Sequence, residues 1–253
     1  MAYLTVDEQA TYVDVLCDGY TVRIYKTSTN SYFGDVYISG TREMYLYSAI
    51  RSGSTFYNTG MADPKTVELL ENTSTRVQVR ITGIYRSSTP ADLTGCDAVT
   101  TVLTFYADRF IHNTQIEANV TGITVDGYLY CAGRISMIDS NPMANEDGIM
   151  ESSGSEVDMA VNQYHDSAKY CGIIGDEATY IGVVLAGSGT IRQFANGSDN
   201  GPIFGWNDVT LAEGAHDLQV MWIIDSAERT GSAKLYNSTD RLAMGDQYKD
   251  LVI

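Results

Sequence analysis

Apolar and polar residues alternate with a period of two along much of the chain, as in strands that bury only one face. In residues 76–85, valine and isoleucine alternate with arginine, glutamine and threonine. Residues 99–106 follow after a loop, and residues 110–120 follow across a link that is long enough only for a hairpin. These three segments predict an antiparallel meander.

Other segments with the composition of strands are spaced as in a sandwich, and no segment has the period of a long helix. They are residues 21–25, 33–38, 44–50, 180–186, 217–224 and 233–236. We therefore expect an all-β chain: one domain, residues 1–253, forming a large antiparallel two-sheet β-sandwich of the super-sandwich or jelly-roll type. Two polar, aperiodic stretches predict long loops: an acidic loop or insertion at about 138–158, and a second loop at 196–205.

The net charge of the chain indicates which classes of partner it disfavours. Acidic residues outnumber basic ones 32 to 16, for a formal net charge of −16. This field repels phosphate backbones and anionic lipid surfaces, so we expect no nucleic acid and no membrane partner. The first residues lack the pattern of a signal peptide, which predicts synthesis in the cytoplasm. Four widely spaced cysteines predict single thiols rather than zinc ligands or a compact disulfide framework: Cys17, Cys96, Cys131 and Cys171.

The acidic stretch carries oxygen ligands of the kind that calcium selects, namely Asp139, Asn141, Asn145 and Asp147. It departs from the EF-hand pattern, because Met143 and Ala144 stand where that pattern has Asx and Gly. A structural calcium and a solvated acidic loop are the two interpretations, and the second is favoured. No other cofactor is expected.

His112 lies close to Tyr106 and Arg109 around a strand corner. The three side chains offer a base, an acid and a clamp for a carboxylate, which a lyase acting beside a sugar carboxylate requires. The alternative is a hydrogen-bonded structural histidine, because alternation places His112 on the strand face of Phe110 and Ile116. No confident catalytic residue follows from the sequence.

Two pairs of alternating tyrosines, Tyr45 with Tyr47 and Tyr128 with Tyr130, are candidate contacts for a carbohydrate or a protein interface. A tyrosine buries much area with little loss of entropy while its hydroxyl stays in water. The alternative is that tyrosine simply suits half-buried strands.

The segment VELLENTSTRVQVRITGIYRS, followed by AVTTVLTFYADRFIHNTQIEANVTG, resembles the core of the super-sandwich in galactose-mutarotase-like domains and in some exo-acting polysaccharide lyases. Residues 101–106 and 110–120 take the places of the two long strands. The resemblance implies the fold, and with it a carbohydrate-binding or polysaccharide-lyase-like protein as one expected function. It transfers no site residue.

The chain differs from those enzymes, because it has no export signal and reads as the sandwich alone. In this free-standing form it also resembles uncharacterised structural proteins of tailed phages. That likeness implies a non-enzymatic interaction protein of the virion, such as a decoration, baseplate or fibre module, which assembles with copies of itself or with other virion proteins. This is our first functional expectation from the sequence, and the carbohydrate-related protein is the alternative.

Overall fold

The computed structural model describes residues 4–28, 32–38, 40–107, 109–126 and 208–225, and between residues 129 and 205 it describes the strands alone. Every regular element in this part of the chain is a strand. No helix there is long and apolar enough to span a membrane. The all-β prediction is confirmed.

One layer is a six-stranded antiparallel sheet built mainly from the N-terminal hairpins, in the order β1-β2-β3-β4-β5-β15. Its strands are β1 (Thr5–Glu8), β2 (Tyr12–Leu16), β3 (Tyr20–Tyr25), β4 (Gly34–Ile38), β5 (Thr41–Leu46) and β15 (Arg134–Ile135).

The other layer is a nine-stranded sheet, in the order β17-β16-β19-β20-β24-β12-β11-β9-β8. Its pairs β9–β11 and β11–β12 are antiparallel, which confirms the predicted meander. The strands are β8 (Thr66–Asn72), β9 (Val77–Gly83), β11 (Cys96–Phe105), β12 (Arg109–Ala118), β16 (Gly148–Glu151), β17 (Glu156–Asp158), β19 (Tyr170–Ile174), β20 (Thr179–Ala186) and β24 (Gly214–Asp225).

Three smaller sheets complete the described strands, in the orders β10-β7-β6-β14, β13-β23 and β18-β21-β22. Their strands are β6 (Ala49–Ser52), β7 (Thr55–Asn58), β10 (Arg86–Ser87), β13 (Ile123–Thr124), β14 (Leu129–Tyr130), β18 (Gln163–His165), β21 (Thr190–Asn196), β22 (Asp199–Gly205) and β23 (Thr210–Leu211).

The strand predictions need two corrections. Residues 44–50 are not one strand, because β5 ends at Leu46 and β6 begins at Ala49 in another sheet. The predicted loop at 196–205 is wrong for residues 199–205, because these form β22, which pairs with β21. Within the acidic stretch 138–158, the described residues are those of β16 and β17, which pair with each other. The predicted strand at 233–236 lies outside the described residues.

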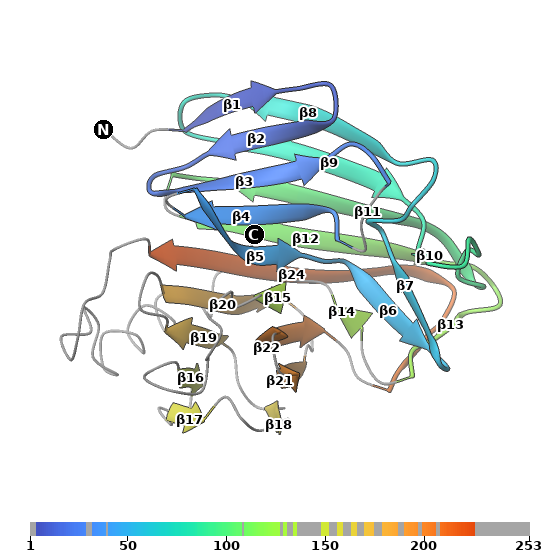
Figure 1. Ribbon diagram of the computed structural model, residues 1–253. Coiled ribbons are helices and arrows are strands. Elements are labelled where there is room, and N and C mark those ends of the chain that lie inside the picture. The colour runs from blue at the N-terminus through green and yellow to red at the C-terminus, as the bar shows by residue number, and fades with distance from the viewer. Residues whose placement is uncertain are drawn as a thin grey trace.

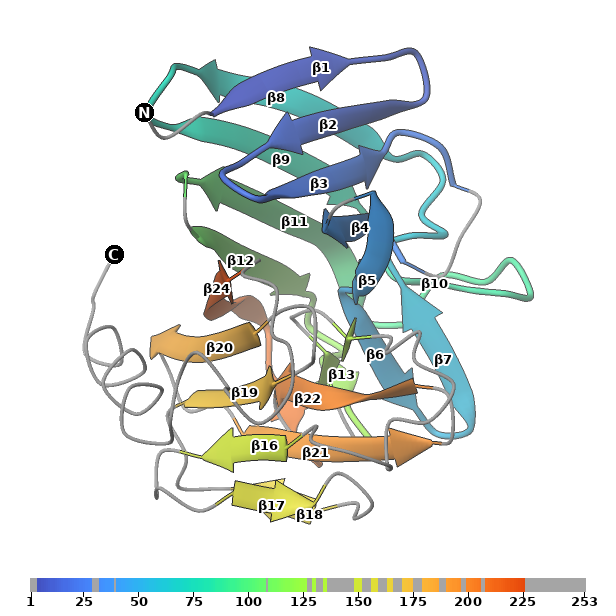
Figure 2. The same cartoon turned by 60° about the vertical axis from the view of Figure 1, so that its left-hand side comes forward.

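The main core lies between the two large layers, which Figure 1 shows with β1 to β5 in front of β8, β9, β11 and β12. Figure 2 shows the same two layers after a turn of the molecule. Alternation explains the packing, because the apolar residues of each strand point to the other sheet. The core includes Val22 and Ile24 from β3, Val79 from β9 and Trp222 from β24. The prediction of a two-layered sandwich is thus confirmed.

A second cluster of buried residues includes Ile50, Tyr85 and Ile116. Cys96 belongs to this cluster and Cys17 to the main one, and both are buried thiols. The pairing state of the four cysteines stays a prediction.

Candidate functional site

The outer side of strands β2 to β5 carries aromatic and charged side chains. In β2, Val13 and Val15 are buried in the core, so Tyr12 and Asp14 lie on the opposite side of the sheet. The same alternation applies along β3 and β4. In β5, which has a register shift, Arg42 and Tyr45 pair with Tyr37 and Asp35 of β4 and so lie on the same side of the sheet. We call the following set the tyrosine face: Tyr12, Asp14, Arg23, Tyr25, Tyr32, Asp35, Tyr37, Arg42, Tyr45 and Tyr47. Figure 1 views the sheet from this side.

Strand register lines up the centre of this face. Asp14 pairs with Arg23, Arg23 with Asp35, and Asp35 with Tyr45. Four side chains from four neighbouring strands therefore form one row across the sheet. The order of the groups along it is carboxylate, guanidinium, carboxylate and phenol.

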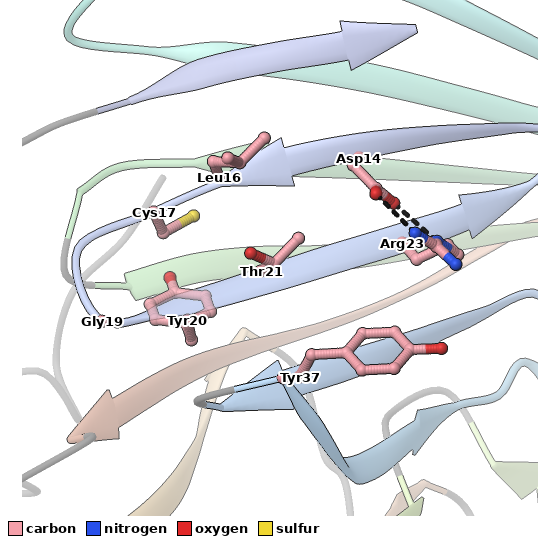
Figure 3. A pocket seen from close by; sticks show the side chains of 9 residues that line it. Asp14, Leu16, Cys17, Gly19, Tyr20, Thr21, Arg23 and Tyr37 are labelled. Atoms are coloured by element: carbon pink, nitrogen blue, oxygen red, sulfur yellow. Dashed lines mark hydrogen bonds and ion pairs between the residues drawn. The ribbon is translucent and has the colours of Figure 1, made fainter. Parts of the chain in front are cut away.

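A hollow of about 610 Å³ opens beside this row, at the end of the sheet where the β2–β3 and β4–β5 turns lie (Figure 3). Gly19 and Gly40 form these turns with φ of 83° and 84°, a region that favours glycine. The hollow is lined by Asp14, Leu16, Cys17, Gly19, Tyr20, Thr21, Arg23, Tyr37 and Gly40.

Arg23 is held in one orientation at the edge of the hollow. Its Nε donates to Asp14 Oδ1 at 2.8 Å and its Nη2 donates to Asp14 Oδ2 at 2.7 Å. Its guanidinium carbon also lies 3.9 Å from the ring centre of Tyr12 and 5.4 Å from that of Tyr37. The hydrogen bonds to Asp14 raise the pKa of Arg23, so the group stays a cation.

Asp35 lies at the centre of the row and is fully buried. Tyr25 Oη donates to Asp35 Oδ2, and Tyr37 Oη donates to the same oxygen at 3.3 Å. No described group donates to its other oxygen, Oδ1. Burial raises the pKa of Asp35 against the opposing effect of these hydrogen bonds. Burial and the bond to Asp35 also raise the pKa of Tyr25.

Four tyrosine rings continue the face beyond Asp35. Tyr32 lies with its ring centre 4.6 Å from Tyr45, 5.9 Å from Tyr47 and 6.1 Å from Tyr25. We call these four residues the tyrosine ladder. Arg42 covers one of them, with its guanidinium carbon 4.5 Å from the ring centre of Tyr45.

The structure brings the predicted contact residues Tyr45 and Tyr47 together, with ring centres 6.2 Å apart. Tyr130 lies in β14 and pairs with Ala49 of β6. Tyr128 lies outside the described residues. The predicted calcium ligands, Asp139, Asn141, Asn145 and Asp147, also lie outside them, and the described part of the chain holds no group of three or more metal-binding side chains.

The three residues of the lyase hypothesis do not meet. Arg109 stacks on Tyr106, with its guanidinium carbon 4.8 Å from the ring centre. His112 is fully buried, packs edge-on against Phe33 at 5.4 Å and bonds Thr114 through Nε2 at 3.2 Å. Alternation along β12 places Arg109 and His112 on opposite sides of the sheet. Burial lowers the pKa of His112 to about 3.

Sequence reasoning missed most of the tyrosine face, including Asp14, Arg23 and Asp35. The signal was present in YVDVL, YTVRIY and GDVYI, where charged or aromatic residues alternate with valine and isoleucine. Those strings identify outward residues in three strands, but only the register shows that they are neighbours.

A comparison with solved structures identifies proteins of similar fold. The alpha-N-acetylgalactosaminidase NagBb from Bifidobacterium bifidum, as a quadruple mutant, is similar with a TM-score of 0.55 and 11% identity over 92% of this chain and 39% of the enzyme chain. The structure of its GalNAc complex is similar with a TM-score of 0.55 and 11% identity, over 85% of this chain and 36% of that chain. The present chain thus spans well under half of that enzyme.

A galactose mutarotase-like protein from Clostridium acetobutylicum is similar over nearly its whole length. The TM-score is 0.50 with 9% identity, over 89% of this chain and 99% of that chain. No family model matches the chain, and no curated protein matches it.

These likenesses confirm the predicted resemblance to galactose-mutarotase-like sandwiches at the level of the fold. The structural neighbours are carbohydrate-active or mutarotase-like proteins, and nothing among them supports the expected virion role. At 9–11% identity, these likenesses concern the fold.

Proposed function

We propose that this protein binds a neutral carbohydrate on the tyrosine face. The observation that carries the proposal is the row of Asp14, Arg23, Asp35 and Tyr45, flanked by half-buried tyrosines beside an open hollow. Sugar sites commonly combine aromatic rings with a few fixed polar groups in this way.

The fixed polar groups match the chemistry of a polyol. The two bonds to Asp14 use two of the five N–H donors of Arg23, which leaves donors for a ligand. The hydroxyl protons of Tyr25 and Tyr37 are directed at Asp35, so their oxygens offer acceptors. A sugar hydroxyl both donates and accepts, and therefore satisfies both kinds of group.

The balance of charge favours a neutral sugar over an acidic one. Two carboxylates, Asp14 and Asp35, lie among two guanidiniums, Arg23 and Arg42, so the face has no surplus of positive charge. The whole chain carries −16. This field opposes the approach of an anionic polysaccharide.

The proposal is one of binding without a reaction. Both carboxylates of the row are engaged: Asp14 by Arg23 and Asp35 by two tyrosine hydroxyls beneath the surface. The similar structures support the choice of a carbohydrate as the ligand, because one is an alpha-N-acetylgalactosaminidase with GalNAc bound and another is galactose mutarotase-like.

The test is a glycan array of neutral and acidic saccharides, followed by calorimetric titration of each sugar that binds. We expect binding to neutral saccharides, and we expect Tyr45→Ala to weaken it about tenfold, the equivalent of ~1.4 kcal/mol. Tyr106→Ala is the matched control, since each of these tyrosines is stacked with an arginine.

The control also tests whether the ligand binds near Tyr106 instead of on the tyrosine face. Binding that survives Tyr45→Ala but is lost in Tyr106→Ala moves the site to the nine-stranded sheet. An array without any bound saccharide contradicts the proposal.

A further inference from the structure

The tyrosine face is longer than one sugar ring. Its central row crosses from Asp14 on β2 to Tyr45 on β5, which is three strand spacings. Neighbouring strands lie ~4.8 Å apart, so the row is about 14 Å long. A monosaccharide covers only part of this length.

The two ends of the face differ in character. At one end, the hollow presents the ion pair of Asp14 and Arg23 beside Thr21 (Figure 3). At the other end, the ladder presents the surface of tyrosine rings, and Tyr32 packs against Tyr25 and Tyr45. The first end suits hydrogen bonding to hydroxyls, and the second suits stacking on the apolar side of a sugar ring.

Asp35 joins the two ends. Its carboxylate accepts from Tyr37, which lines the hollow, and from Tyr25, which belongs to the ladder. Burying a carboxylate without a salt bridge is costly unless its lone pairs are satisfied, and no described group donates to Oδ1. Asp35 fixes two phenol oxygens as acceptors at the junction of the two ends.

We infer that the ligand is an extended neutral oligosaccharide, with one sugar in the hollow and the following sugars stacked on the tyrosine ladder. This inference rests on the proposed function and deepens it, because it states the ligand's length and its course from the hollow to the tyrosine ladder.

The first test uses the native protein alone. Calorimetric titrations with cello-, malto- and galacto-oligosaccharides, each from monosaccharide to hexasaccharide, give affinity as a function of length. We expect the affinity for the bound series to rise at least tenfold with the first added sugars and then level off. An affinity that does not change with length, while sugars do bind, overturns the inference but leaves the proposed function standing.

The second test separates the two ends. Tyr47→Ala removes a ladder ring, so it should weaken the binding of long oligosaccharides more than that of the shortest one and reduce the gain in affinity with length. Arg23→Gln alters the hollow, so it should weaken all lengths alike. Equal weakening of all lengths by Tyr47→Ala overturns the inference. If no saccharide of any length binds, the proposed function fails together with it.

Discussion

At the scale of single residues, Asp35 is the most informative side chain of the molecule. It is fully buried in the sheet that carries the candidate site, and its pKa is raised by that burial. The folded protein therefore holds its proton more tightly than the unfolded chain, whose carboxyl titrates near 3.8. The free energy of unfolding therefore falls as the pH rises from 3.8 through the pKa of Asp35 in the folded protein. It stays lower up to neutral pH.

We predict that Asp35→Asn stabilises the fold at neutral pH. We expect a higher unfolding midpoint than that of the native protein at neutral pH. The gain should vanish below pH 3.8, where the native carboxyl is protonated in both states. Calorimetric unfolding of both proteins across the acid range measures it.

Asp14→Asn is the matched control, because Asp14 makes a two-bond ion pair with Arg23. This variant should lose stability at neutral pH. An Asp35→Asn protein that is also less stable than the native one at neutral pH would show that the hydrogen bonds from Tyr25 and Tyr37 outweigh burial.

At the scale of elements, the close approach of β3 and β4 holds the row together. Gly34 begins β4 directly before Asp35, and a Cβ built there meets the backbone oxygen of Arg23 at 2.5 Å. A backbone oxygen cannot move away as the end of a flexible side chain can. Glycine is therefore required at this position for the pairing of Arg23 with Asp35.

We predict that Gly34→Ala separates β3 from β4, with a loss of about 1–3 kcal/mol in stability and at least a tenfold loss in sugar affinity. Urea unfolding and calorimetric titration measure the two effects. Gly53→Ala is the control: its φ of +57° makes alanine strained, but a Cβ there meets nothing within 4 Å. It should cost about 1–2 kcal/mol of stability and leave affinity intact.

Equal losses of affinity in both variants would mean that binding follows general stability rather than the spacing of β3 and β4.

Elements also show where sequence reasoning succeeded. Alternation located β3, β9, β11, β12 and β24, because half-buried strands expose every second residue. It failed at β22, whose glycine, asparagine, aspartate and proline are typical turn formers. Pairing with β21 imposes the extended backbone there, and a single sequence does not reveal that pairing.

At the scale of the whole molecule, the predicted sandwich and the pairing of Tyr45 with Tyr47 are found, whereas the site as a unit could not be predicted. Asp14, Arg23 and Asp35 belong to different strands, and their adjacency depends on the registers of two hairpins. A shift of one residue would turn a strand's outward set into the core. The predicted calcium, the oligomer and the virion location stay predictions.

We propose that the ligand contacts this protein on the outer side of β2 to β5. Side-chain oxidation footprinting with mass spectrometry, with and without a saturating neutral oligosaccharide, tests it most directly. We predict slower oxidation of Tyr37, Tyr45 and Tyr47 in the bound protein, with Tyr106 unchanged. Protection of Tyr106 while the tyrosines of the six-stranded sheet keep their rates would contradict the account.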